Sequence, residues 1–178
     1  MKPHFRKLGV TAHVTFSVGW LGADAAFLAL ALVGLASQDA QMMRAMYLAM
    51  DLTGWFVIVP FSFAALLTGL VLALGTPWGL FRHYWILAKF VLTMGAIIIL
   101  LVHTKAMGEA ARRVSGATGE TLLGLTAHLA ASGHLGDVQV QLAVAAGAGL
   151  LVLLAITTLG VYKPWGRTPY GRRKVSQP

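Results

Sequence analysis

Four long apolar runs restrict the fold of this chain more than any other feature. They fall at about 8–36, 52–75, 84–106 and 138–162. Each is at least as long as the roughly 18–20 residues that a helix needs to cross about 30 Å of hydrocarbon. Only 11% of the residues are charged, whereas a soluble domain carries about 25%. We therefore predict an all-α integral membrane protein, in which residues 1–178 form one transmembrane domain, an antiparallel bundle of four helices.

The basic residues are distributed unevenly around these runs. Nine of them stand at the two chain ends and in the 76–83 turn, with no acid nearby: Lys2, Arg6, Lys7, Arg82, Lys163, Arg167, Arg172, Arg173 and Lys174. The positive-inside rule then predicts that both termini and this turn are cytoplasmic. We interpret the net charge of +8 as this topology signal and expect the lipid bilayer, not nucleic acid, as the partner. The absence of cysteine excludes disulfides and thiolate metal sites.

Two polar residues inside the runs are candidates for a site. A lysine within a span costs roughly 2.5–3.5 kcal/mol on insertion, so Lys89 is a functional hypothesis by default. With about 1.5 Å of rise per residue, His13 and Lys89 both lie roughly 8–10 Å from the cytoplasmic ends, and Thr68 and Thr157 reach a similar level. Trp20 shares a helical face with His13. The sequence therefore predicts an inner polar cluster drawn from all four helices.

This cluster has a cofactor interpretation and a structural one. Imidazole is a common axial ligand of haem, and four-helix bundles hold cofactors between facing helices. Lys89 would then be a second ligand as a neutral amine, or a charged partner of a haem propionate or of Asp24. Alternatively, His13 only bonds a backbone carbonyl and Lys89 extends towards the headgroups. The residues alone leave both interpretations open.

A second candidate site lies on the outer side, on the connections between the runs. Soft thioethers beside imidazoles suit Cu(I), although methionines on one helical face also serve as plain apolar contacts. The metal candidates are His13, His103, His128 and His134, the last three forming the outer site with Met42, Met46, Met50 and Asp51.

Several small or rigid residues predict local geometry. Pro60 is expected to kink the second helix. Pairs of small residues, Gly19/Ala23 and Ala143/Gly147, predict close approaches between helices. Residues 121–132 are typical of a short amphipathic helix on the outer surface.

Two segments resemble known membrane families. The run Ala12-His13-Val-Thr-Phe-Ser-Val-Gly-Trp20-Leu-Gly resembles the opening helix of the copper resistance D family and of uncharacterised four-helix relatives, where a histidine precedes a Trp-Leu-Gly or Trp-Val-Gly step. Trp85-Ile-Leu-Ala-Lys89-Phe-Val-Leu is similar to that family's Leu-hydrophobic-Lys-hydrophobic-Leu segment. The same histidine and lysine pair occurs in the membrane-bound, haem-containing bacterial protoporphyrinogen oxidases, which the chain resembles distantly. The resemblance implies a haem b or metal site on His13 and Lys89 in a bacterial inner membrane. Ala25-Ala-Phe-Leu replaces the arginine-rich features of the oxidases, so their activity does not follow.

We therefore expect a haem b protein of the membrane that transfers electrons, with quinone or another redox partner. Whether it is itself a haem-dependent oxidoreductase, and whether identical copies associate, stays open. The alternative is a copper or proton transport protein that uses Asp24 and Lys89 as intramembrane charges, or an accessory subunit without a cofactor. Hydrolase and nucleotide-binding motifs are absent from the sequence.

Overall fold

Helices make up nearly all of the computed structural model of this chain, and its description covers residues 2–76, 79–115, 134–164, 166, 168 and 169. The helices are α1 (Pro3–Ala36), α2 (Ala40–Thr53), the π-helix η1 (Gly54–Ile58), α3 (Val59–Gly75), α4 (Tyr84–Ser115) and α6 (His134–Tyr162). The described part contains no strand. Four stretches are long and apolar enough to cross a membrane: Pro3–Ala36, Gln41–Gly75, Tyr84–Val102 and Val140–Tyr162. The predicted all-α, four-helix membrane bundle is confirmed.

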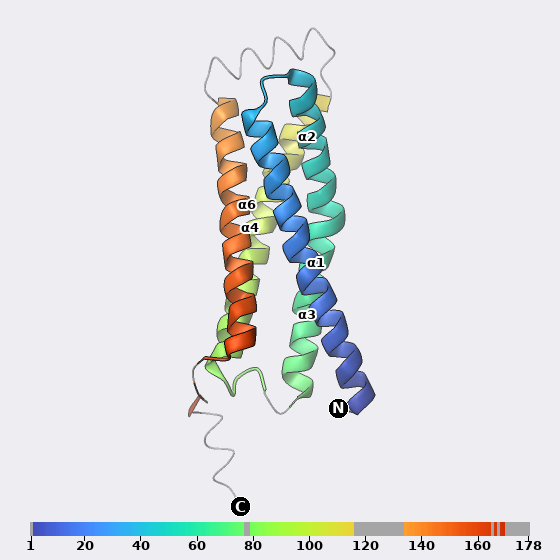
Figure 1. Cartoon of the computed structure of the whole chain (residues 1–178), viewed down its shortest axis with the longest axis vertical. Helices are drawn as coiled ribbons and strands as arrows, with labels where there is room; N and C mark the ends of the chain where they lie inside the picture. The colour runs from blue at the N-terminus through green and yellow to red at the C-terminus, as the bar shows by residue number, and fades with distance from the viewer. Residues whose placement is uncertain (1, 77–78, 116–133, 165, 167, 170–178) are drawn as a thin grey trace, which may run out of the picture.

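The four spans form an antiparallel bundle in which α1 and α4 lie diagonally. Helix α1 packs mainly against α3 and α6, whereas α4 packs against α6, α2 and α3. Figure 1 shows the start of α1, the end of α6 and the α3–α4 turn at one end, and the α1–α2 connection at the other. We call the half that contains residues 3–18, 66–76, 79–96 and 154–162 the termini-side half. The remainder of the bundle is the loop-side half.

The second span begins earlier than the sequence predicts. We expected it to start at Leu52, with the preceding methionines on an outer connection, but α2, η1 and α3 run on without a break from Ala40 to Gly75. The connection before α2 is therefore short. Asp39 ends it by capping α2, since its carboxylate accepts hydrogen bonds from the backbone N–H groups of Gln41 and Met42, each at 3.2 Å. A strong cap allows the helix to begin in a stretch whose hydropathy alone is low.

A π-helix lies just before Pro60, the residue expected to kink the second span, and the kink itself stays a prediction. Proline has no N–H group, so the regular helical bond to the carbonyl four residues earlier is missing. The residue before the proline, Val59, donates its N–H to the carbonyl of Gly54, which is five residues back and not the usual four. The wider turn affects packing: it keeps Gly54, Ile58 and Ser62, which follow one another at four-residue spacing, together on one buried face. Such spacing drifts off one face of a regular α-helix.

The loop-side half holds the main core of the bundle. Small residues let the helices approach closely there, as expected for packing within lipid. At Gly19 an added Cβ would lie only 2.5 Å from the ring of Phe61 on α3, which also packs edge-to-face on Phe16 with ring centres 5.8 Å apart. The approach predicted at Gly147 is not found, since no atom lies within 4 Å of a Cβ there. The buried core residues are Trp20, Phe27, Ala31, Tyr47, Met50, Ile58, Ala65, Ile97, Leu142, Ala146 and Leu153.

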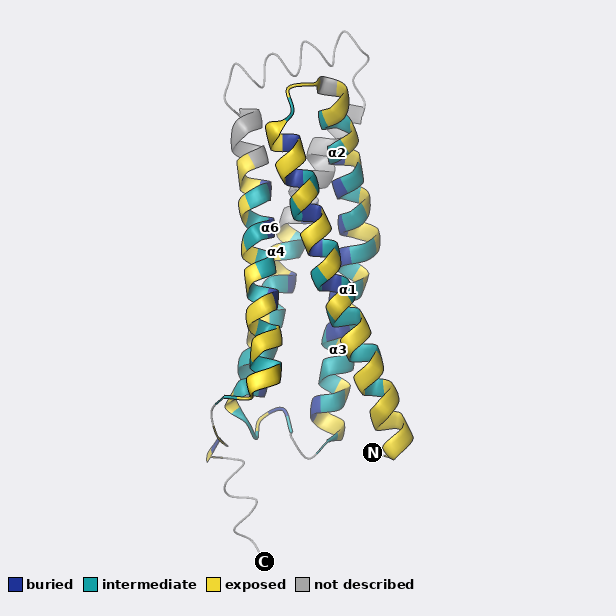
Figure 2. Cartoon of the chain, viewed as in Figure 1, coloured by how far each residue is buried: buried dark blue, intermediate teal, exposed yellow. Residues whose placement is uncertain are grey.

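The termini-side half is packed more loosely. The inward face of α1 that carries Trp20 and Asp24 continues through Ser17 and His13, but these two residues are only half-buried. Helix α1 has no buried residue before Trp20, and α6 has none after Leu153. In Figure 2 the buried positions gather in the loop-side half, while the lower parts of α1 and α6 are intermediate or exposed. The inward surfaces of this half are thus incompletely covered by neighbouring side chains.

A small second cluster closes the α3–α4 turn, where Ala73, Leu80 and Ile86 are buried together. Gly79 adopts a positive φ of 58°, which a residue with a Cβ adopts only with strain. The segment after α6 folds back onto this turn: Thr168 donates its hydroxyl to the carbonyl of Phe81 at 2.6 Å.

Candidate cofactor site

His13 is tied directly to α3 by its ring. Its Nδ1 lies 3.0 Å from the carbonyl oxygen of Ala65 and 3.1 Å from Oγ1 of Thr68. The Thr68 hydroxyl donates its own hydrogen to the carbonyl of Ala64 at 2.6 Å, so its oxygen accepts from the imidazole. Because both neighbours of Nδ1 are acceptors, the ring hydrogen must lie on Nδ1. The lone pair of the neutral ring is then on Nε2.

This arrangement matches that of metal-binding histidines, which donate one ring N–H to a carbonyl and bind through the other nitrogen. Within the described part of the chain, Nε2 of His13 has no hydrogen-bond partner. The sequence-based alternative, a histidine that simply bonds a carbonyl, is compatible with the same bond. The two interpretations differ only in whether Nε2 binds a ligand.

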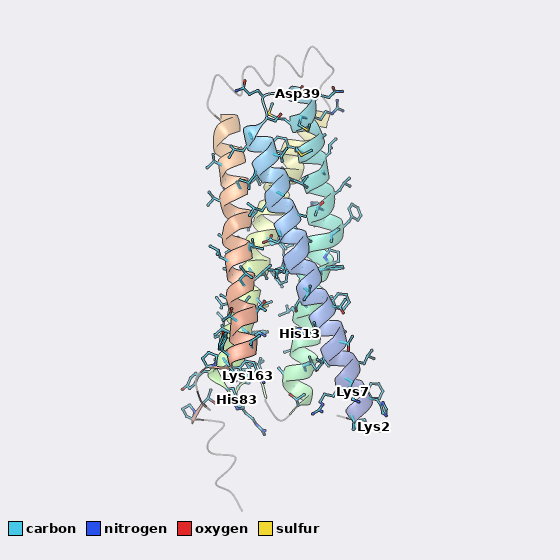
Figure 3. The ribbon with its side chains drawn as sticks, viewed as in Figure 1. Lys2, Lys7, His13, Asp39, His83 and Lys163 are labelled. Carbon is cyan, nitrogen blue, oxygen red and sulfur yellow. The ribbon has the colours of Figure 1, made fainter. Side chains whose placement is uncertain are left out.

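Gly69 on α3 lies against the ring of His13. A Cβ at this position would lie 3.0 Å from Cε1 and 3.4 Å from Nδ1 of the imidazole. Glycine therefore allows the ring to rest on the backbone of α3, and a larger residue would push it away. Figure 3 shows His13 in the lower part of the bundle beside α1 and α3, well above Lys7 and Lys2.

Lys89 lies on α4, diagonally across the termini-side half from α1, which carries His13, and is half-buried. Its ammonium rests on the backbone of α6, where a Cβ at Gly160 would come within 2.8 Å of Nζ. The helices that carry and contact His13 and Lys89 pack around one bundle, since α1 and α4 both pack against α3 and against α6. Among the described residues Lys89 forms no ion pair. A cation at this depth without a protein anion is a site that an external anion or a ligand atom would complete.

The two other residues predicted for this cluster are placed differently. Trp20 is only 5% exposed and belongs to the loop-side core, about 10 Å further along α1 than His13. Thr157 is exposed, and its hydroxyl donates to the carbonyl of Leu153 in its own helix at 2.8 Å. Of the predicted set, the structure therefore brings together His13 and Thr68, with Lys89 across the bundle.

Asp24 is the buried charged residue of α1, only 8% exposed. Its carboxylate lies against α6, where a Cβ at Gly149 would be 3.2 Å from Oδ2, and Oδ2 has no hydrogen-bond partner among the described residues. Gly149 and Gly160 mark the levels of Asp24 and Lys89 on α6, and they are about 16 Å apart along the helix. The ion pair between Lys89 and Asp24 that the sequence allowed is therefore excluded.

The predicted outer metal site is described only in part. The side chains of His103 and His134, and all of His128, lie outside the described residues. Met42, Met46 and Met50 run along α2 from an exposed position to a buried one, and Met50 packs in the core. Across the described ranges, no three side chains among His, Cys, Asp and Glu gather as metal ligands would. Copper binding here stays a prediction.

Sequence reasoning missed the three glycines that shape these sites: Gly69, Gly149 and Gly160. Each lies where a polar side chain of another helix meets a helix backbone. Glycine within an apolar helix signals such contacts only weakly, because it also serves simple helix packing. Comparison with protein-family models, with curated proteins and with solved structures finds no match to this chain.

Proposed function

We propose that the chain is a membrane haem b protein that transfers electrons, with His13 as an axial ligand. The observation that carries this proposal is the hydrogen-bonding of the imidazole, which holds Nδ1–H on the Ala65 carbonyl and leaves the Nε2 lone pair for iron. A ligand position inside a helix bundle is where haem proteins of this kind bind their cofactor. When bound, the haem supplies one-electron redox chemistry, and a quinone or another redox protein is the partner we propose.

The looseness of the termini-side half supports this proposal. A planar macrocycle needs inward surfaces that protein side chains do not already cover. Ser17 and His13 on α1 and Gly160 on α6 provide half-buried inward positions of this kind. The inward surfaces of the loop-side half are instead occupied by the buried core that includes Trp20 and Leu153.

Lys89 completes the proposed site from the opposite side. An unpaired ammonium within a span is unfavourable, and a haem would relieve this in one of two ways. Lys89 would bind the iron as a neutral amine, or it would pair as a cation with a propionate. Either role uses the position of Nζ over Gly160, on the far side of the bundle from Ala65.

The test is the absorption spectrum of the full-length protein purified in detergent from haem-replete cells. We expect a Soret band, with α and β bands that sharpen on reduction. His13→Ala should remove most of the haem, whereas the matched variant His4→Ala, an exposed histidine nine residues earlier on the same helix, should keep it. A colourless wild-type protein, or equal haem content in both variants, would contradict the proposal.

Lys89→Met separates the two roles of the lysine, because methionine keeps the length of the side chain and removes its charge. If the lysine binds iron, its loss should shift the Soret band and change the spin state. If the lysine pairs with a propionate, haem retention should fall with little spectral change. If the variant keeps its full haem content and an unaltered spectrum, Lys89 neither binds the iron nor pairs with a propionate.

We further propose that the protein lies in a bacterial inner membrane with both termini cytoplasmic, on the strength of the nine unaccompanied basic residues. The chain has no native cysteine, so single cysteines can be introduced at Gly116 and at Ser176. A membrane-impermeant maleimide should label the first in intact cells and the second only after permeabilisation. The reverse pattern would overturn this orientation.

Proton transport is the second candidate function, and Asp24 is the observation that favours it. A carboxyl group that is 8% exposed within a span, with an unpartnered Oδ2, is a position where protons are often carried. In proteoliposomes that contain a pH-sensitive dye, Asp24→Asn should abolish any proton flux that the wild-type protein supports. Equal fluxes in the two proteins would remove this candidate.

A further inference from the structure

A groove opens between the first turns of α1 and the last turns of α3, at the termini-side end of the bundle. Its volume is about 620 Å³. Two basic residues, two apolar residues and two threonines line it: Arg6, Lys7, Val10, Thr11, Leu72 and Thr76. His13 and Lys89 are not among the lining residues, so this groove is distinct from the proposed haem site.

The charge of the groove is concentrated at its mouth. Arg6 and Lys7 are exposed, in the second turn of α1, and no acidic residue is among the described residues that line the groove. Lys7 extends from the start of α1 in Figure 3. Two adjacent cations at the end of a membrane span lie at the level of the lipid phosphates. A guanidinium and an ammonium together match the oxygens of one phosphodiester.

Below its mouth the groove is lined mainly by the apolar side chains of Val10 and Leu72, with Thr11 as the polar exception. Val10 stands one turn deeper than Arg6 on α1, about 6 Å along the helix. Leu72 faces it from α3, one turn deeper than Thr76. The Thr76 hydroxyl already donates to the carbonyl of Leu72 at 2.7 Å, so it does not present a free donor inside the groove. A ligand that fits this gradient has an anionic head and an apolar chain beneath it.

We propose that this groove binds one anionic phospholipid of the adjoining leaflet. The phosphate lies between Arg6 and Lys7, and an acyl chain runs along Val10 and Leu72. Charge complementarity selects an anionic lipid over a zwitterionic one, because a zwitterionic headgroup adds its own cation beside these two. Its position at the end of a span selects a lipid over a soluble anion.

The experiment is native mass spectrometry of the full-length protein in detergent, titrated with phosphatidylglycerol or with phosphatidylcholine. We expect one phosphatidylglycerol to be retained preferentially. R6Q/K7Q should weaken its retention by about tenfold. The matched control R172Q/R173Q removes the same charge from the C-terminal tail and should leave retention unchanged. Circular dichroism establishes that each variant keeps its helices.

Two further arms identify the groove itself. V10W keeps both cations and fills the space beneath them, so it should also weaken phosphatidylglycerol retention. Glycerol 3-phosphate, a soluble headgroup without acyl chains, should fail to displace the lipid. Equal retention of the two lipids, equal losses in R6Q/K7Q and R172Q/R173Q, no effect of V10W, or full displacement by glycerol 3-phosphate would each overturn the proposal.

Discussion

The two halves of this bundle are built on different principles although the same helices run through both. In the loop-side half, small residues and aromatic rings interlock, as Gly19 and Phe61 do. In the termini-side half, the inward face of α1 carries His13 and Ser17 and stays half-exposed. Within lipid the hydrophobic effect does not favour helix association, so packing contacts hold the helices together. Stability is therefore concentrated where packing is complete, and polar chemistry lies where it is not.

The sharpest way to break this comparison is to shorten one apolar side chain in each half. Ile58 is 1% exposed in the loop-side half, and Val14 is 52% exposed in the termini-side half. Ile58→Ala should lower the free energy of unfolding by about 1–3 kcal/mol, mainly through the cavity it leaves, since the side chain stays in an apolar medium either way. Val14→Ala should change it by less than about 0.5 kcal/mol.

The measurement is unfolding of the protein in mixed micelles as the fraction of denaturing detergent is raised. If the two substitutions destabilise the protein equally, the halves do not differ in packing and the comparison fails.

A second substitution sharpens the comparison by acting on the proposed site alone. Gly69→Ala places a methyl group 3.0 Å from Cε1 of His13, so the ring must shift. We expect haem affinity to fall about tenfold, equivalent to about 1.4 kcal/mol, with little loss of stability. Gly95→Ala is the control, because no atom lies within 4 Å of a Cβ there.

Haem titration monitored at the Soret band gives the two affinities. Equal affinities would mean that the contact between α3 and the imidazole does not position an iron ligand.

The smallest expected effect concerns the end of the loop-side half. Asp39→Ala removes the two hydrogen bonds that cap α2, and we expect a loss of about 1 kcal/mol. The neighbouring Gln38→Ala serves as a control, because Gln38 is exposed and caps nothing. Detergent unfolding, as for Ile58, measures both. A loss in neither variant would show that core packing alone holds this end together.

The spans were predictable from the sequence because apolar length is a direct consequence of bilayer thickness. The start of the second span was not, since Arg44 and Asp51 lower the hydropathy of α2 and conceal that it continues into α3. The cap by Asp39, which sets that start, depends on a side chain reaching two backbone N–H groups.

The site was predictable only in outline. Counting residues placed His13 and Thr68 at one level, and the structure joins them through a hydrogen bond. The same counting gave Thr157 an inward role, although it is exposed. Depth follows from residue number, but the direction of a side chain depends on how neighbouring helices rotate. The contact of Lys89 with Gly160 depends on such rotation.

The π-helix at Gly54–Ile58 is the one described stretch of the second span that can lose a residue without turning its two ends against each other. A wide turn takes up one extra residue while the α-helix on either side keeps its phase. Deleting one residue there would return the span to a regular α-helix, with Tyr47 and Met50 still on the same side as Ser62 and Ala65. Deleting one residue from the regular part of α2 or α3 would instead rotate the two faces by about 100°. The five residues of the wide turn therefore hold the tolerance of this span for a change in length.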